Sequence, residues 1–131
     1  MKSKRVKRRD DQPPRATAGW GWRFHHLGIP TDIPRSGEKY LPRYGMHVSG
    51  FESSPFGIEW MRFDPDSEVA EIIRQLPHLA FTVDDLDAAV KGRELIGKIS
   101  SPSPGVRVAM FEAEGAVIEL LEFTGGEDPG S

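Results

Sequence analysis

The stretches His25–Ile33 (HHLGIPTDI) and Pro77–Leu86 (PHLAFTVDDL) decide the fold, because they repeat one pattern of residue types 52 positions apart. Each places a histidine and a leucine before small and apolar residues, which is typical of a β-strand bounded by turn residues. A second pair of stretches, Gly57–Phe63 (GIEWMRF) and Val117–Phe123 (VIELLEF), also matches, with a glutamate among apolar residues in each. The chain is therefore predicted to contain two copies of one structural unit.

The residues between these phrases predict the same order of elements in each half: strand, helix, then further strands. In the first half we expect a strand, a short irregular helix and two strands, over Arg23–Thr31, Ser36–Gly45, Met46–Phe51 and Phe56–Phe63. In the second half we expect a strand, a helix and three strands, over Pro77–Val83, Asp84–Glu94, Leu95–Ser103, Val106–Glu114 and Ala116–Phe123. Asp84 or Asp85 is the predicted N-cap of the second helix.

The predicted domain organisation is one domain between two extensions. Residues 1–21 are basic and then rich in proline and alanine, which predicts a disordered arm. Residues 22–123 form the domain, with module one over 22–66 and module two over 76–123, and residues 124–131 form a flexible tail. Like-charge runs at a terminus are more often solvated tails than nucleic-acid contacts, so no nucleic-acid partner is expected.

The composition restricts the possible chemistry. The chain has no cysteine, which excludes disulfides and thiolate zinc sites, so a metal would need histidine or carboxylate ligands. No apolar run is long enough to cross a bilayer, and the N-terminus lacks the apolar stretch of a secretory signal. The expected location is the cytoplasm, and no membrane partner is expected.

Four polar side chains occupy strand faces that are otherwise small or apolar. Strand alternation places His26 with Gly28 and Pro30, and His78 with Ala80 and Thr82. By the same count Glu59 lies in line with Met61 and Phe63, and Glu119 with Val117 and Leu121. A carboxylate in an apolar row is unfavourable unless it is paired, coordinated or protonated. Two imidazoles and two carboxylates on corresponding strands suit one divalent ion.

Each of these residues also has an ordinary interpretation. A single strand histidine is more often a hydrogen-bonded core residue, and a glutamate near a strand end usually faces water. The repeated pairing is what favours a metal site. His25 falls on the opposite face from His26 and is predicted to be structural or surface-exposed, and His47 has no counterpart in the other half and is predicted not to be a ligand.

These phrases resemble the vicinal oxygen chelate superfamily, which includes glyoxalase I, methylmalonyl-CoA epimerase, extradiol dioxygenases and bleomycin- or fosfomycin-resistance proteins. The resemblance covers residues 22–123, and its most specific phrase is PHLAFTVDDL. It implies an α+β fold of paired βαβββ modules, the first of them shortened, whose strands curl into a metal-binding cup. The ligand pattern is most similar to that of glyoxalase I, with a histidine on the first strand and a glutamate on the last strand of each module.

Carried over to this chain, the resemblance implies the metal ligands His26, Glu59, His78 and Glu119, with Glu119 or Glu59 as the catalytic base. The implied ion is Zn, Ni, Mn, Fe or Co. The implied activity is that of an isomerase or lyase that chelates vicinal oxygens of a small-molecule substrate and moves a proton through an enediolate-like intermediate. Two alternatives remain open, a non-catalytic antibiotic-binding protein and an Fe(II) dioxygenase. A homodimer is the expected assembly.

Overall fold

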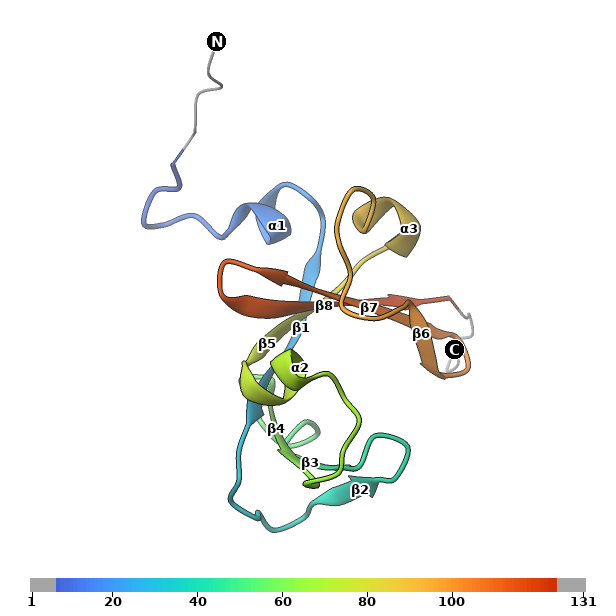
Figure 1. Cartoon of the computed structure of the whole chain (residues 1–131). Coiled ribbons are helices and arrows are strands. Elements are labelled where there is room, and N and C mark those ends of the chain that lie inside the picture. The colour runs from blue at the N-terminus through green and yellow to red at the C-terminus, as the bar shows by residue number, and fades with distance from the viewer. Residues whose placement is uncertain (1–6, 125–131) are drawn as a thin grey trace.

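The computed structural model describes residues 7–124, and these form one mixed eight-stranded sheet with short helices (Figure 1). The strands are β1 (Arg23–Pro30), β2 (Lys39–Leu41), β3 (Met46–Ser49), β4 (Ile58–Phe63), β5 (His78–Thr82), β6 (Ser100–Ser103), β7 (Val106–Ala113) and β8 (Ala116–Phe123). The helices are α1 (Arg15–Ala18), α2 (Glu71–Gln75) and α3 (Leu86–Ala89).

The sheet has the internal symmetry that the repeated phrases predict. Its strand order is β2-β3-β4-β1-β5-β8-β7-β6, so the order within module one is mirrored in module two. The first strands of the modules, β1 and β5, pair antiparallel at the centre, and each pairs on its other side with the last strand of its own module in parallel. This arrangement places the two histidine phrases side by side between the two glutamate phrases.

Module one lacks the helix that the sequence predicts. Ser36–Gly45 forms strand β2 and a turn instead of a helix, and β2 pairs antiparallel with β3. Proline at position 42 has no backbone N–H to donate, and Gly37 and Gly45 have φ values of 78° and 59°, which are incompatible with a right-handed helix. Module one is shortened in this way: it has four strands, two of them only three and four residues long.

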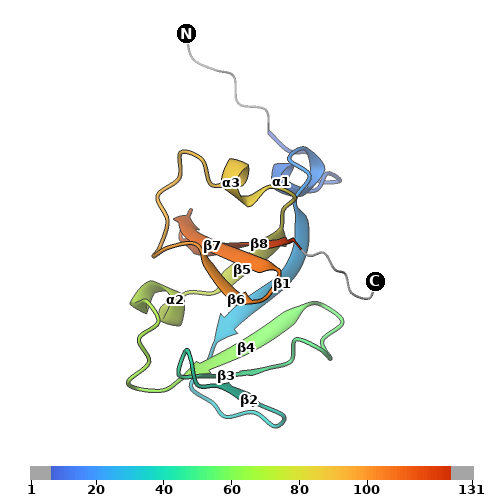
Figure 2. The same ribbon diagram turned by 90° about the vertical axis from the view of Figure 1, so that its right-hand side faces the viewer.

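Module two keeps its helix, and the predicted aspartate cap is confirmed. The side chain of Asp85 accepts a hydrogen bond from the backbone N–H of Ala88. The helix ends at Ala89, earlier than predicted. It covers a core formed by Val83, Leu86, Ala109, Phe111 and Leu120. Figures 1 and 2 show α1 and α3 on one side of β7 and β8, while β2, β3 and β4 lie on the other side.

Glu122 joins this helix to the sheet. Its carboxylate accepts a hydrogen bond of 2.9 Å from the backbone N–H of Leu86 and one of 3.2 Å from Arg107, and the residue is 9% exposed. Replacing Glu122 with alanine leaves a buried N–H unpaired, so we expect the free energy of unfolding to fall by about 1–3 kcal/mol. Urea denaturation measures this loss. Alanine at the exposed Glu112 is the control and should change little, whereas equal effects at both positions would contradict the assignment.

Residues 7–21 of the predicted arm are described and contain α1, whereas residues 1–6 and 125–131 lie outside the described residues. The ring of Trp20 lies 5.0 Å from that of Trp22, which in turn lies 5.7 Å from Phe81 of β5. The residues just before β1 therefore pack on the module-two sheet. Within residues 7–124, no helix has the length and apolar character needed to span a membrane.

Candidate metal centre

The two repeated histidines meet at the centre of the sheet. In the antiparallel pairing of β1 with β5, Gly28 lies opposite His78 and Ala80 opposite His26, so both imidazoles leave the same face. Their Nε2 atoms are 3.0 Å apart, and the residues are 5% and 3% exposed. Two buried ring nitrogens at this separation share either a proton or a cation.

Both repeated glutamates reach the same point from the flanking strands. Nε2 of His26 lies 3.4 Å from Oε1 of Glu59 and 3.5 Å from Oε1 of Glu119. Nε2 of His78 lies 3.1 Å from Oε1 of Glu119. The structure thus brings together all four side chains that the sequence singled out. Ring nitrogens of His26 and His78 and a carboxylate oxygen of Glu59 all lie within 4.8 Å of one another, a possible metal site.

Gly28 makes room for the imidazole of His78. A Cβ atom on Gly28 would lie 2.5 Å from both ring nitrogens of His78, and closer still to Cε1. Real Cβ contacts are not this short, so any larger residue at position 28 would displace the ring. The glycine in HHLGIPTDI is therefore needed for space at the site.

The two carboxylates have different electrostatic surroundings. Burial acts to raise the pKa of Glu119, but hydrogen bonds from His26 and His78 and the charge of both rings outweigh it and hold the pKa at about 2. Burial raises the pKa of Glu59, where the charge of His26 opposes the rise and that of Glu119 adds to it. Glu119 is thus the more tightly held carboxylate of the pair.

The donor set fits a divalent ion. Nitrogen and oxygen ligands bonded at about 2.0–2.2 Å to one ion lie about 3–3.5 Å from each other. Four of the separations between these donors, from 3.0 to 3.5 Å, match this spacing, and the donor atoms of His26, Glu59 and His78 all lie within 4.8 Å of one another. Two neutral imidazoles and two carboxylates would also balance the charge of a divalent cation. His26, Glu59 and His78 are the residues that could hold it in this arrangement, and Glu119, which contacts both imidazoles, is the fourth candidate.

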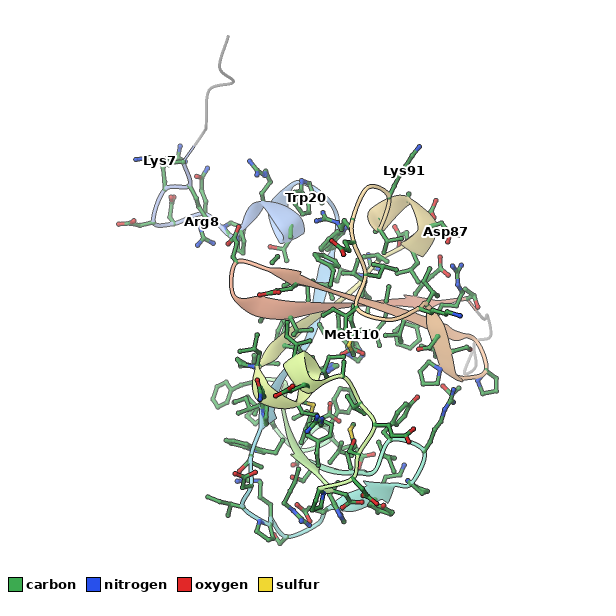
Figure 3. All side chains as sticks on the ribbon, in the orientation of Figure 1. Lys7, Arg8, Trp20, Asp87, Lys91 and Met110 are labelled. Carbon is green, nitrogen blue, oxygen red and sulfur yellow. The ribbon has the colours of Figure 1, made fainter. Side chains whose placement is uncertain are left out.

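A cavity of about 560 Å³ opens beside this cluster, and all four side chains line it. Three of the chain's four methionines contribute to its wall, and Figure 3 shows one of them, Met110, projecting from β7 toward the half that contains β2, β3 and β4. The other apolar residues of the wall include Phe63, Val69, Ile73, Ile96 and Val108. Three charged, exposed residues also line the cavity: Arg43, Glu68 and Lys98.

His25 does not lie where strand alternation predicts. The pairing register of β1 with β5 is irregular between Phe24 and His26, and this irregularity breaks the simple alternation of faces. Nδ1 of His25 lies 2.8 Å from Nδ1 of His26, so the prediction of opposite faces is wrong. His25 is half-buried and contacts a candidate ligand directly. No signal in the sequence indicates this irregularity.

His47 lies away from the cluster, in a separate polar group on β2, β3 and β4. Its Nε2 atom lies 3.4 Å from Asp64, and its ring lies 4.6 Å from that of Tyr40. Tyr40 donates a hydrogen bond of 2.6 Å to Asp64. His47 therefore lies among side chains that already contact one another, and that it is not a ligand stays a prediction.

Comparison with known proteins supports the fold. No family model matches the chain, and no curated protein matches it. A solved structure of a hypothetical protein from Bacillus halodurans is similar, with a TM-score of 0.60 and 19% identity over 82% of this chain and 99% of that chain. A methylmalonyl-CoA epimerase from Mycobacterium tuberculosis is also similar, with a TM-score of 0.50 and 20% identity over 79% of this chain and 89% of that chain. These likenesses confirm the predicted α+β, glyoxalase-like fold.

Proposed function

We propose that the protein is a metal-dependent isomerase or lyase of the vicinal oxygen chelate superfamily. It would bind a substrate through two neighbouring oxygens and move a proton through an enediolate-like intermediate. The observation that carries this proposal is the convergence of two imidazoles and two carboxylates beside an apolar cavity. The likeness of this chain's fold to that of a methylmalonyl-CoA epimerase supports the proposal, as does the glyoxalase-like ligand pattern of its sequence.

A divalent ion held by these residues would act as a Lewis acid that stabilises negative charge on substrate oxygens. His26 and His78 are buried and fixed by the central strand pair, so we assign them a holding role. Glu119 contacts both imidazoles, whereas Glu59 meets the imidazole of His26 alone at a comparable distance. Glu59 has fewer contacts to break, and we assign it as the base that accepts the substrate proton.

The cavity defines the kind of substrate that fits. Methionine side chains are flexible and polarisable, and they adapt to irregular apolar groups. A wall that includes Met46, Met61 and Met110 therefore favours a substrate with an apolar body next to its oxygens. Arg43 and Lys98 outnumber Glu68 among the exposed charged residues of the lining, which suits an anionic group at the outer end.

One alternative has an observation in its favour. His26, Glu59 and His78 form a set of two histidines and one carboxylate, which is the donor set of Fe(II) oxygenases. Glu119, 3.1 Å from His78, adds a fourth donor that such sites lack. The isomerase or lyase proposal accounts for all four residues.

The proposal includes a homodimer. The sheet is open, and its edge strands β2 and β6 each leave one side unpaired within the described residues. Such edges are commonly covered by association with another chain.

Solvent-proton exchange tests the proposed reaction. The metal-loaded protein is incubated in deuterium oxide with hemithioacetals, acyl-CoA epimers and catechols, and deuterium in the recovered compounds is measured by mass spectrometry. We expect exchange at the carbon next to a chelating oxygen pair in one of the first two classes. Glu59→Gln should slow it about a hundredfold or more while the metal stays bound. Exchange at an undiminished rate in Glu59→Gln would contradict the base assignment, and oxygen consumption with a catechol would favour the dioxygenase.

A further inference from the structure

The cluster has a neighbour that the ligand pattern does not include. His26 directs Nε2 to the other three side chains, so its second ring nitrogen, Nδ1, is left on the far side of the ring. Nδ1 of His25 lies 2.8 Å from this atom, at hydrogen-bonding distance. When Nε2 of His26 binds a cation, its Nδ1–H donates, and Nδ1 of His25 is placed to accept.

Two phenylalanines hold the ring of His25 in this position. Its centroid lies 5.3 Å from that of Phe51 and 5.8 Å from that of Phe123, with tilted interplanar angles of 32° and 36°. Phe51 also meets the ring of His26 edge-on at 5.6 Å. These contacts come from the segment after β3 and from the end of β8, so both modules fix the position of His25.

The second module has no equivalent of His25. The residue before His78 is Pro77, which has no side-chain nitrogen, and Nδ1 of His78 is buried without a hydrogen-bond partner among residues 7–124. The ring of His78 instead packs directly over the backbone of Gly28, in space that a side chain at position 28 would fill. Sequence repetition therefore hides a difference between the two halves: one candidate ligand is held by packing and the other by a hydrogen bond.

We propose that His25 is a positioning residue that fixes the orientation of the His26 imidazole, so that Nε2 faces the metal centre. The inference rests on the proposed metal site and concerns how that site is held. An outer hydrogen-bond partner sets the ring orientation and raises the basicity of a metal-binding histidine. In the phrase HHLG, His26 then faces the metal centre and His25 fixes the orientation of its ring.

Paired variants separate the hydrogen bond from packing. His25→Phe keeps an aromatic ring between Phe51 and Phe123 but removes Nδ1, whereas His25→Asn has an oxygen bonded to Cγ, as Nδ1 is in histidine. We expect His25→Phe to weaken Co²⁺ affinity about 10- to 100-fold, measured by competition with a chromophoric chelator, and His25→Asn to retain most of it. His47→Phe, which alters a histidine outside the cluster, should leave affinity unchanged. Unchanged affinity in His25→Phe, or equal losses in both His25 variants, would overturn the proposal.

A second measurement does not depend on the metal. In protein labelled with ¹⁵N on histidine, we expect one downfield imidazole proton that is protected from solvent and couples to Nδ1 of both His25 and His26. It should disappear in His25→Phe. If the wild-type protein binds no Co²⁺ but shows this proton, the proposed function fails and the positioning contact stands. If it binds Co²⁺ and lacks the proton, the positioning proposal fails and the metal site stands.

Discussion

Replacing Gly28 with alanine is expected to abolish tight metal binding while the sheet still forms. The added Cβ would lie 2.5 Å from both ring nitrogens of His78, so the imidazole must leave its place beside Glu119. Gly28 is absent from the residues with positive φ, so alanine brings no backbone strain. We expect a stability loss of about 1–3 kcal/mol from overpacking. Metal affinity should fall by about a hundredfold or more, because displacing a ligand costs more than losing an outer partner.

Gly19→Ala is the matched control for this experiment. A Cβ at position 19 would meet its nearest atom at an ordinary 3.4 Å, and the residue lies outside the cluster. Metal titration and circular dichroism of both variants distinguish a local effect from unfolding. Wild-type affinity in Gly28→Ala would show that His78 does not contribute to metal binding from the position seen in the structure.

The second large effect concerns Glu119 in the metal-free protein. Its pKa is held at about 2 in the folded chain, below the ordinary value of 4.5, because the hydrogen bonds from His26 and His78 outweigh burial. A carboxyl group with a lowered pKa stabilises the fold above its unfolded pKa, and this contribution is lost as pH falls through the folded value. Glu119→Gln should therefore be less stable than wild type near neutral pH, by about 1–3 kcal/mol.

The difference between these two proteins should shrink as pH falls from 4.5 toward 2, where the carboxyl of Glu119 takes up a proton. Urea denaturation in the presence of a chelator, repeated across this range, measures it. Glu112→Gln, at an exposed position on β7, is the control and should track wild type at every pH. A Glu119→Gln difference that stays constant with pH would contradict the charge assignment.

The repeated phrases allowed much of the central sheet and the site to be predicted. Strand alternation predicted that His26, His78, Glu59 and Glu119 each lie on a strand face with small or apolar residues. The mirrored strand order places their four strands side by side at the centre of the sheet, where the side chains meet. Such prediction succeeds where a strand is regular and its partner repeats the same pattern. The prediction that these four residues bind a metal remains to be tested.

The parts that the sequence did not predict have three separate causes. The irregular pairing near His25 arises from the way β1 meets β5, and nothing in the local residue pattern specifies it. Ser36–Gly45 resembles a helix by its place in the repeat, but its proline and glycines favour a strand and turn that pair with β3. Helices α1 and α2 contain only four and five residues, too few to give a hydrophobic period.

Metal content is the most direct test of the four-residue site. Purified wild-type protein is equilibrated separately with Zn²⁺, Ni²⁺, Mn²⁺, Fe²⁺ and Co²⁺, freed of excess ion, and its bound metal is measured by mass spectrometry. The double variant His26→Ala/His78→Ala is treated and measured in the same way. The account predicts one tightly bound ion per chain for at least one of these metals, and its loss from the double variant. Wild-type protein that retains none of them, or a double variant that retains as much, would contradict it.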